Sequence, residues 1–397
     1  MPQALLVADF DSALKYAGRL ADALAAQGAA VRIATPTTVV PTRLGAEQIR
    51  TATDREVEFR TWPQLLAAAR AADVVVPVSD GPTVQRFVRD VHGWTASRLP
   101  VFGAGYVGMA LYDLVGGYLM RSLADVLAVS SRSDLAAFET AGEALGLPTA
   151  NLLLTGLALL PAAPAPPRSG PIRTVVFADQ PTVPARSHER IHIWDRLLEH
   201  AQRHPDRRVL LRPRHRAGER TFHRMGLSPE RWAATRRLPE NLRIDHTPIV
   251  DLLPGTDLLL TVSSTAALEA IAAGCRVAFV DDVLGDAALN PPLLPSGLLR
   301  RFDEIDADAI GTPREAWLDD VFPARTGPAP AERFAARLLE VAADPALRTH
   351  ETAWSSAFHA GRRETDRRLA ALGADRPLRP RRVAAAVLRR GLRVLEG

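Results

Sequence analysis

The chain has 397 residues, of which 47% are hydrophobic and 24% charged, and its formal net charge is +4. The hydrophobic share excludes a disordered or collagen-like chain, and at about 100–200 residues per domain the length predicts two domains. The single cysteine, Cys275, excludes an internal disulfide and a zinc site built from cysteines, so we expect a small buried side chain there.

Apolar runs of strand length alternate with helical patterns through residues 1–160. The predicted elements are strands at 4–8 and 30–34, a helix at 12–27 between them, a strand at 73–78 with a helix to about 91, and strands at 125–129 and 151–155. Residues 103–121 are glycine-rich without a buried strand before them, so they do not match a dinucleotide fingerprint and are expected to form a loop and helix. Buried β-branched strands separated by helices predict βαβ units and a parallel sheet.

A proline-rich stretch at 161–171 is predicted to be a stiff linker, because proline disrupts the interior of helices and strands. The alternation then restarts, with strands at 172–178, 208–212, 242–245, 257–262 and 276–280 and helices at 187–203 and 265–273. The sequence therefore predicts an α/β protein with two similar halves. Ligands of open parallel sheets bind beyond the carboxyl ends of the strands, so the expected site is a cleft between the halves.

Three hydroxyl side chains, Ser263, Ser264 and Thr265, stand between a buried strand and a helix. Hydroxyls and free backbone N–H groups at such a point suit a phosphate, although a plain helix cap would need only one of them. Glu269 follows on the same helix, where it could hold a sugar or ribose hydroxyl or simply face solvent.

A second polar cluster follows the strand at 208–212. It consists of Arg212, Arg214, His215 and Glu219. Two guanidinium groups beside an imidazole suit a phosphate or a carboxylate, and the alternative is a solvated arginine-rich loop.

The first strand also ends in a polar cluster, formed by Asp9, Asp11, Ser12 and Lys15. A carboxylate that faces a cleft can act as a general base, whereas Asp11 could instead only cap the helix. The Asp-Phe-Asp spacing could also hold a metal, but no further acidic ligand is evident and we predict none. Lys15 is the only lysine in the chain, a weak indication that an ammonium group is required there.

Three more polar residues stand at predicted strand ends, namely Ser79, Asp80 and Gln180. We expect the first two to lie on the same side of the cleft as Asp11, and Gln180 to face the cleft from the second half.

These motifs resemble those of bacterial GT-B glycosyltransferases that build capsules, teichoic acids and lipooligosaccharides: CMP-sialic acid and CMP-Kdo transferases, polysialyltransferases and CDP-glycerol polymerases. That group pairs a His-Pro motif with a Ser-Ser or Ser-Ser-Thr motif that grips the donor phosphate, and residues 263–265 match the second. The order Arg-Pro-Arg-His at 212–215 lacks the His-Pro pair, which weakens the implied preference for cytidine.

Over residues 4–300 the chain is also similar to a set of actinobacterial proteins assigned as glycosyltransferases. Their Asp-Asp-Ser-Lys run after the first strand is matched by Asp9, Asp11, Ser12 and Lys15, their Arg-Pro-Arg and Gly-Glu runs by 212–214 and 218–219, and a late Asn and Ser-Gly by Asn290, Ser296 and Gly297.

The resemblance implies transfer of a sugar from a nucleotide-activated donor, for example a CMP-linked nonulosonic acid or Kdo, to a hydroxyl of a cell-envelope glycan or glycolipid. It implies no metal and no other cofactor, because helix N-termini and basic side chains neutralise the leaving phosphate. Asp11, or else Asp9, would be the base, and Lys15 would orient Asp11 or an anionic acceptor. The residues on the donor would be Ser263, Ser264, Thr265, Arg212, Arg214, His215, Glu219, Glu269 and Gln180, and those on the acceptor side Ser12, Ser79 and Asp80.

Two alternatives remain at this stage. A sugar-nucleotide epimerase or hydrolase of the same fold would turn over the donor without an acceptor, and a non-catalytic partner would bind it without turnover. A nucleic-acid function is not expected, because aromatic residues are sparse and no basic run is interleaved with them.

The GT-B resemblance implies domains at 1–160 and 172–327, the first for the acceptor and the second for the donor, with helices at 328–375 crossing back to the first. Residues 376–397 hold seven arginines and one glutamate in an amphipathic pattern, typical of a helix on an anionic membrane surface or of a packed terminal helix. The start of the chain does not resemble a signal peptide, and no run of roughly 18–20 apolar residues occurs. We therefore expect a cytoplasmic protein with peripheral contact to the inner membrane.

Overall fold

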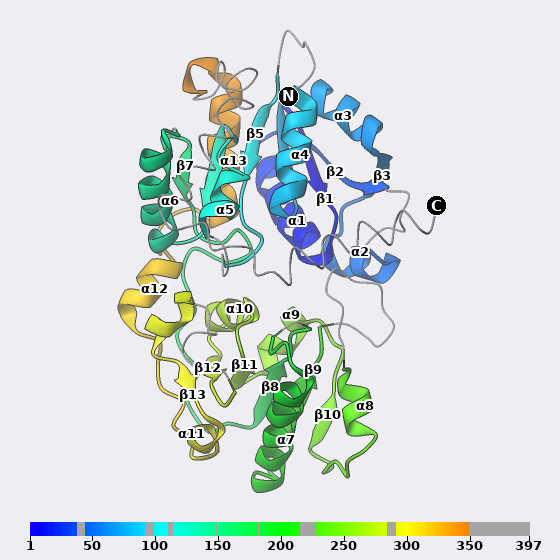
Figure 1. The fold of residues 1–397 in the computed structure, drawn as a ribbon, viewed down its shortest axis with the longest axis vertical. Coiled ribbons are helices and arrows are strands. Elements are labelled where there is room, and N and C mark those ends of the chain that lie inside the picture. The colour runs from blue at the N-terminus through cyan, green and yellow to red at the C-terminus, as the bar shows by residue number, and fades with distance from the viewer. Residues whose placement is uncertain are drawn as a thin grey trace.

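The computed structural model describes residues 1–37, 44–92, 99–109, 114–147, 149–181, 183–214, 227–283 and 291–348. Two separate parallel β-sheets with helices on both faces form the two halves of the molecule (Figure 1). Within these ranges, none of the helices is both long enough and apolar enough to cross a membrane. The expected α/β class with two Rossmann-like units is confirmed.

The first sheet has the strand order β3-β2-β1-β4-β5-β6-β7. Its strands are β1 (Gln3–Ala8), β2 (Ala30–Thr37), β3 (Val57–Thr61), β4 (Val74–Val78), β5 (Val101–Ala104), β6 (Val126–Val129) and β7 (Leu152–Leu154). In the interior strand β1, Leu5 pairs with Arg32 of β2 and with Val75 of β4. All five residues of β4 are buried, as expected for a parallel strand covered on both faces.

Six helices belong to this half: α1 (Asp11–Ala26), α2 (Ala46–Ala52), α3 (Trp62–Ala71), α4 (Gly81–His92), α5 (Leu114–Leu119) and α6 (Arg132–Leu145). Helix α1 buries Leu14, Ala17, Ala21 and Leu24, which recur on one face of a helix, and it turns its polar residues outward. Its first residue, Asp11, follows the end of β1 closely, so the helix begins at the carboxyl end of that strand.

The second sheet has the strand order β10-β9-β8-β11-β12-β13. Its strands are β8 (Thr174–Ala178), β9 (Arg208–Arg212), β10 (Leu242–Ile244), β11 (Leu258–Thr261), β12 (Arg276–Val280) and β13 (Leu299–Arg300). The helices are α7 (Ser187–Arg203), α8 (Pro229–Ala233), α9 (Ile249–Leu252), α10 (Ala266–Ala272), α11 (Phe302–Asp306) and α12 (Glu315–Val321), with short 3₁₀ turns at Leu253–Gly255 and Pro291–Ser296. Cys275 is buried in this half, and burial raises the pKa of its thiol.

The last described helix, α13 (Pro330–Ala343), returns to the first sheet, where Figure 1 shows it beside β5. Its Phe334 and Leu338 join the core cluster that also contains Leu14 and Leu20 of α1. A Cβ atom on Gly103 of β5 would lie 2.8 Å from Leu338, so this strand needs a glycine where the helix crosses it. A 3₁₀ turn at Pro345–Leu347 follows.

Some sequence expectations need correction or lie outside the described residues. A buried strand, β5, does precede the glycine-rich segment, and a four-residue strand containing a glycine gave too weak a pattern to predict. The elements that were also missed are strands β3 and β13 and helices α2, α3, α6, α8, α9, α11 and α12. The predicted domain boundaries stay predictions, and residues 349–397, with the basic tail, lie beyond the described part of the chain.

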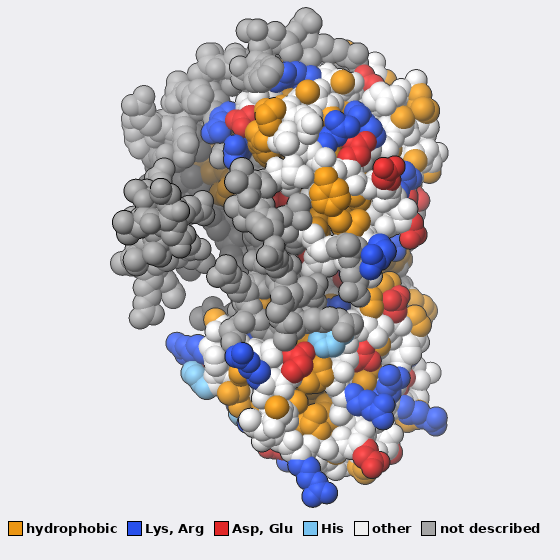
Figure 2. Space-filling view, turned by 90° about the vertical axis from the view of Figure 1, so that its right-hand side faces the viewer, with side chains coloured by type: hydrophobic (Ala, Val, Ile, Leu, Met, Phe, Trp, Pro, Cys, Tyr) orange, Lys and Arg blue, Asp and Glu red, His pale blue; other side chains and the backbone are white. Residues whose placement is uncertain are grey.

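Basic and acidic side chains are interspersed over both halves on the face drawn in Figure 2. Hydrophobic side chains on this face form only small groups. The exposed large hydrophobic side chains include Phe59 on the edge strand β3 and Val250 on α9.

Candidate functional site

The carboxyl ends of the two sheets meet, and one arginine joins them. Nη2 of Arg214, two residues after β9, lies 3.2 Å from Oδ1 of Asp11 and 3.1 Å from Oγ of Ser12 at the start of α1. At a second contact, Oγ1 of Thr265 lies 2.9 Å from the position of a Cβ on Gly108, so glycine permits this close approach. We call this region the junction; three of the predicted polar motifs contribute to it.

On the first-half side of the junction, carboxylates follow β1. Asp9 accepts a hydrogen bond of 2.7 Å from the hydroxyl of Ser79, which follows β4 and is buried. Asp80 accepts a hydrogen bond from the backbone N–H of Thr83, at 2.8 Å, and thereby caps α4. Ser79 and Asp11 thus lie at neighbouring strand ends as expected, while Asp80 has a structural function.

Arg121 also supports this side, and sequence reasoning missed it. Its buried guanidinium donates hydrogen bonds to the backbone carbonyls of Ser79, Gly105 and Gly117, and it lies 4.4 Å above the ring of Tyr106. Burial lowers the pKa of Arg121, although nearby Tyr106 and Asp80 oppose the shift. The guanidinium therefore ties together the loops that follow β4 and β5. The signal in the sequence was a lone arginine at the end of an apolar segment.

On the second-half side, the three hydroxyls predicted to act together have different partners. Oε1 of Gln180 accepts hydrogen bonds from the backbone N–H and the hydroxyl of buried Ser263, at 3.0 and 3.2 Å. The hydroxyl of Ser264 accepts from the backbone N–H of Ala266 at 3.2 Å. Thr265 makes no side-chain cap bond to α10 and faces Gly108 instead. Ser264 and Thr265 are the half-buried members of the trio.

A buried ion pair holds Gln180 in place. Nη2 of Arg190 on α7 lies 2.6 Å from Oδ2 of Asp179, and both side chains are only 3% exposed. Arg190 also donates to the backbone carbonyl of Gln180, and the indole of Trp194 donates to Asp179 at 3.2 Å. Burial raises the pKa of Asp179 to about 6, although Arg190 acts in the opposite direction. None of these supporting contacts was predicted, because an arginine inside an amphipathic helix gives no distinctive signal.

Positive charge surrounds a half-buried carboxylate at the centre of the junction. Burial raises the pKa of Glu269 on α10, and four cations from both halves oppose that rise, in the order Lys15, Arg212, Arg214 and Arg19. Burial and the neighbouring Arg214 lower the pKa of Arg212, whose Nε donates to the carbonyl of Thr247 at 3.2 Å. The carboxylates of Asp11, Glu269 and Asp245 act in turn on Arg212, so charges of both signs gather at the junction. The guanidinium groups of Arg212 and Arg214 among them suit an anionic ligand.

The remaining predicted residues lie elsewhere. His215, Glu219 and Asn290 lie outside the described residues. The hydroxyl of buried Ser296 accepts from the backbone N–H of Leu298 at 3.1 Å, and Gly297 has a φ of +77°, so this pair forms a turn.

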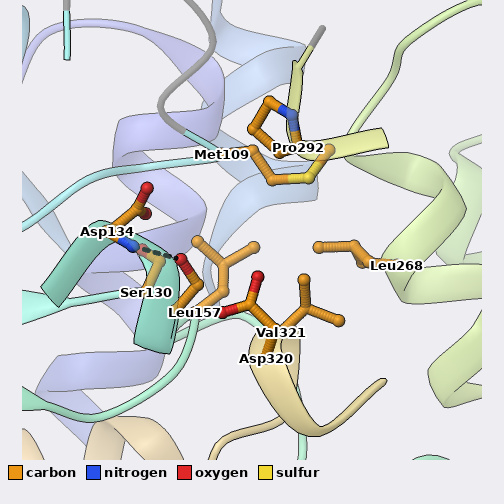
Figure 3. A pocket seen from close by; sticks show the side chains of 9 residues that line it. Met109, Ser130, Asp134, Leu157, Leu268, Pro292, Asp320 and Val321 are labelled. Atoms are coloured by element: carbon orange, nitrogen blue, oxygen red, sulfur yellow. Dashed lines mark hydrogen bonds between the residues drawn. The ribbon is translucent and has the colours of Figure 1, made fainter. Parts of the chain in front are cut away.

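Away from the junction, a further contact between the halves contains a small cavity, which Figure 3 shows. Its volume of about 20 Å³ suits a single water molecule and is far too small for a nucleotide. Asp320 of α12 accepts hydrogen bonds of 2.7 and 2.8 Å from the backbone and hydroxyl of Ser133 at the start of α6. Burial raises the pKa of Asp134, beside it, to about 6, and the charge of Asp320 adds to the shift. This contact joins the two halves without forming a ligand site.

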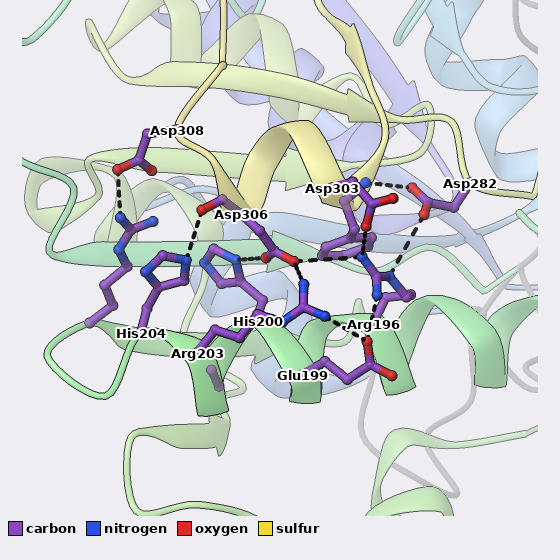
Figure 4. Close-up of polar contacts among 12 residues, drawn as sticks. Arg196, Glu199, His200, Arg203, His204, Asp282, Asp303, Asp306 and Asp308 are labelled. Carbon is purple, nitrogen blue, oxygen red and sulfur yellow. Dashed lines mark hydrogen bonds and ion pairs between the residues drawn. The ribbon is translucent and has the colours of Figure 1, made fainter.

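Within the described ranges, the group with metal-ligand geometry consists of His200, His204 and Asp306, in a part of the chain where the sequence patterns indicated no metal site. Figure 4 shows that this group is part of an ion-pair network between α7 and α11. Asp306 accepts from Nδ1 of His200 at 2.6 Å and is paired with the guanidinium groups of Arg203 and Arg196. Because two guanidinium groups already neutralise this carboxylate, the cluster fits a structural clamp and does not fit a metal.

Comparison with known proteins agrees with this architecture. The profile of a family described as "Putative glycosyltransferase (DUF6716)" matches residues 4–340. No curated protein sequence matches the chain.

Solved structures with a similar fold include three nucleotide-sugar proteins. UDP-GlcNAc 2-epimerase of Methanocaldococcus jannaschii, in complex with UDP-GlcNAc and UDP, has a TM-score of 0.55 at 11% identity, covering 86% of this chain and 100% of its own. UGT89C1 of Arabidopsis thaliana, complexed with UDP, also has a TM-score of 0.55 at 11% identity, with coverage of 86% and 100%. A UDP-glucosyltransferase of Polygonum tinctorium that can glucosylate indoxyl has 0.52 at 13% identity, with 86% and 98% covered. At such identities the likeness establishes the fold alone, which is GT-B with two Rossmann-like domains.

Proposed function

The chain belongs to the DUF6716 family of glycosyltransferase-like proteins, and we propose that it transfers a sugar from a nucleotide-activated donor to a hydroxyl of a cell-envelope glycan or glycolipid. One observation carries this proposal. The contact of Arg214 with Asp11 and Ser12 brings a phosphate-binding type of side chain and a candidate base within 3.2 Å across the two halves. A simple helix cap would not need one residue from each half.

The donor phosphate would bind at the second-half side. Arg212 and Arg214 supply positive charge, and the half-buried hydroxyls of Ser264 and Thr265 supply hydrogen-bond donors. Negative charge on the phosphate oxygen grows as its bond to the anomeric carbon breaks, so these groups bind the transition state more strongly than the ground state. We therefore propose a transfer that needs no metal ion. Gln180 would act through Ser263, by fixing the loop that carries the other two hydroxyls.

The acceptor would be activated at the first-half side. Asp11 would take the proton of the acceptor hydroxyl while the acceptor oxygen forms its bond to the anomeric carbon. The bond from that carbon to the phosphate oxygen breaks, and the nucleotide leaves with the electron pair. Asp9, which accepts a hydrogen bond from Ser79, is the second choice of base.

The first experiment is a thermal-shift panel with CMP, CDP, UDP and GDP and their sugars. It decides between a CMP-linked donor, which the Ser-Ser-Thr resemblance favours, and a UDP-linked donor, which the named ligands of the fold relatives favour. The nucleotide sugar that binds is then labelled and supplied with cell-envelope glycans, with and without a chelator.

The decisive variant is Asp11→Asn, and Asp9→Asn tests the second choice of base beside it. We expect Asp11→Asn to lower the transfer rate by about 10²–10⁴-fold while nucleotide binding persists. The proposal fails if both variants transfer sugar like the natural chain. Donor turnover that needs no acceptor would identify an epimerase or hydrolase, and nucleotide binding without any turnover would identify a non-catalytic partner.

The basic segment 376–397 supports a location on the inner face of the cytoplasmic membrane. We propose that its seven arginines attract anionic lipids while its apolar residues enter the interface. Sedimentation with phosphatidylglycerol vesicles tests this: removal of 376–397 should abolish binding, and unchanged binding would overturn the proposal.

A further inference from the structure

We propose that the acceptor carries an anionic group, a phosphate or a carboxylate, and that Lys15 and Arg19 of α1 bind it. The inference rests on the proposed function, because it takes Asp11 as the residue that receives the acceptor hydroxyl. It extends that function from an unspecified glycan to a class of acceptor. Lys15 and Arg19 belong to the first half, whereas Arg212 and Arg214, which would bind the donor, belong to the second.

The geometry of α1 places these residues in one line. Asp11, Lys15 and Arg19 are four residues apart, so they share one face of the helix. The opposite face, with Leu14 and Ala17, is buried against the sheet. At a rise of about 1.5 Å per residue, Lys15 lies about 6 Å and Arg19 about 12 Å from Asp11 along the axis. An acceptor with its hydroxyl at Asp11 would pass both cations as it extends outward.

The acidic residues on the outer side of α1 have partners, whereas these two cations do not. Asp11 is paired with Arg214 at 3.2 Å, and Asp22 with Arg55 at 2.8 Å. Among the described residues, neither Lys15 nor Arg19 forms a hydrogen bond or an ion pair. The positive charge of both acts on Glu269 of the second half, as does that of Arg212 and Arg214. Lys15 is half-buried and Arg19 exposed, so the two side chains are available to a ligand.

The two sides of the junction offer separate cations for two anions. The donor phosphate would be bound by Arg212 and Arg214, on the second-half side. Lys15 and Arg19 belong to the other side, where the carboxylate on their own helix face, Asp11, is already paired with Arg214. A neutral acceptor would make no ion pair with either of these two cations. An acceptor with a phosphate or a carboxylate would neutralise them.

Lys15 permits a direct test, because it is the only lysine in the chain. The full-length protein is acetylated with an N-hydroxysuccinimide ester, and the modification of Lys15 is followed by mass spectrometry, with the amine of Met1 as internal control. The nucleotide with the largest thermal shift is present at saturation, so that the donor site is occupied. Glucose, glucuronate and glucose 6-phosphate then serve as neutral, carboxylate and phosphate probes of one ring size.

We expect glucuronate or glucose 6-phosphate to slow the acetylation of Lys15, with glucose without effect. The more protective of the two identifies the anionic group. Arg19→Gln should weaken the protection by about three- to tenfold, since it removes one exposed charge-assisted contact. Arg237→Gln, which removes an exposed arginine of the second half, is the matched control and should change nothing.

Three results would overturn the inference: equal protection by glucose, no protection by either anionic sugar, or full protection by the nucleotide alone. The last would assign Lys15 and Arg19 to the donor. Failure of the proposed function would give a different result. The protein would then bind no nucleotide and transfer no sugar, but anionic sugars would still protect Lys15 from acetylation when no nucleotide is present.

Discussion

The two sides of the junction are built in different ways. The second-half side rests on Asp179 and Arg190, two buried charges 2.6 Å apart, which fix Gln180 and through it Ser263. The first-half side presents half-buried side chains on α1, such as Asp11, which is paired with Arg214, and Lys15. The phosphate of the nucleotide sugar needs hydrogen-bonding groups that are already in position, whereas the acceptor hydroxyl needs a base that stays accessible. The contrast therefore matches the two functions proposed for the two sides.

The buried aspartates of the two halves sharpen this comparison. Burial raises the pKa of both Asp179 and Asp134 to about 6. Asp179 has Arg190 beside it, whereas the nearest charge acting on Asp134 is another carboxylate, Asp320. Removing the cation beside Asp179 should therefore destabilise the protein, whereas removing the charge of Asp134 should stabilise it at a pH where that carboxyl is ionised.

The largest effect is expected for Arg190→Ala. The substitution leaves the carboxylate of Asp179 buried without its cation, so the free energy of unfolding should fall by about 3–5 kcal/mol. Urea denaturation at pH 7 measures it. Arg186→Ala, at an exposed pair 3.3 Å from Glu189 at the start of the same helix, is the control and should change the value by under about 1 kcal/mol. Similar losses in both variants would mean that the second-half side has no special rigidity.

Asp134→Asn should have a smaller effect of the opposite sign. Burial raises the pKa of Asp134 to about 6 in the folded chain, whereas in the unfolded chain the carboxyl group ionises near its ordinary pKa of 3.8. The folded state therefore loses stability as the pH rises between these values, by up to about 3 kcal/mol. The variant cannot ionise, so it should be more stable than the natural chain at pH 8 and no more stable at pH 4.

Urea denaturation at the two pH values measures this difference. Glu143→Gln, on the exposed side of the same helix α6, is the control for loss of one negative charge. If Asp134→Asn destabilises the protein at pH 8, its carboxylate has a favourable partner and the contrast with Asp179 is wrong.

Much of this fold follows from local patterns in the sequence. Helix α7 has the predicted bounds, 187–203, and β9 the predicted 208–212, because both segments have strong periodicity and clear ends. Strand β5 was missed because its four residues are recognisable only from the helix that covers them, which comes much later in the chain. Phe334 and Leu338 of that helix lie against Gly103 of the strand.

The site could be predicted in part for the same reason. Strand ends indicated Asp11, Arg214 and Ser263 from sequence alone. The sequence did not indicate that Gln180, 83 residues before Ser263, would bind it, or that Arg190 would support both. Such contacts depend on which strands become neighbours, and β8 lies beside both β9 and β11.

The smallest effect concerns that contact between Gln180 and Ser263. Their hydrogen bonds of 3.0 and 3.2 Å make them one unit, so Ser263→Ala and Gln180→Ala should each weaken nucleotide binding by a few-fold, and the double variant little more than either. A coupling free energy of about 1 kcal/mol is expected from calorimetric affinities of the four proteins. Ser264→Ala, whose hydroxyl bonds only to the backbone of Ala266 among the described contacts, should instead add its full effect to that of Gln180→Ala. Additive effects of Ser263→Ala and Gln180→Ala would show that Ser263 meets the donor by itself, and that the second-half side is less preorganised than its buried ion pair suggests.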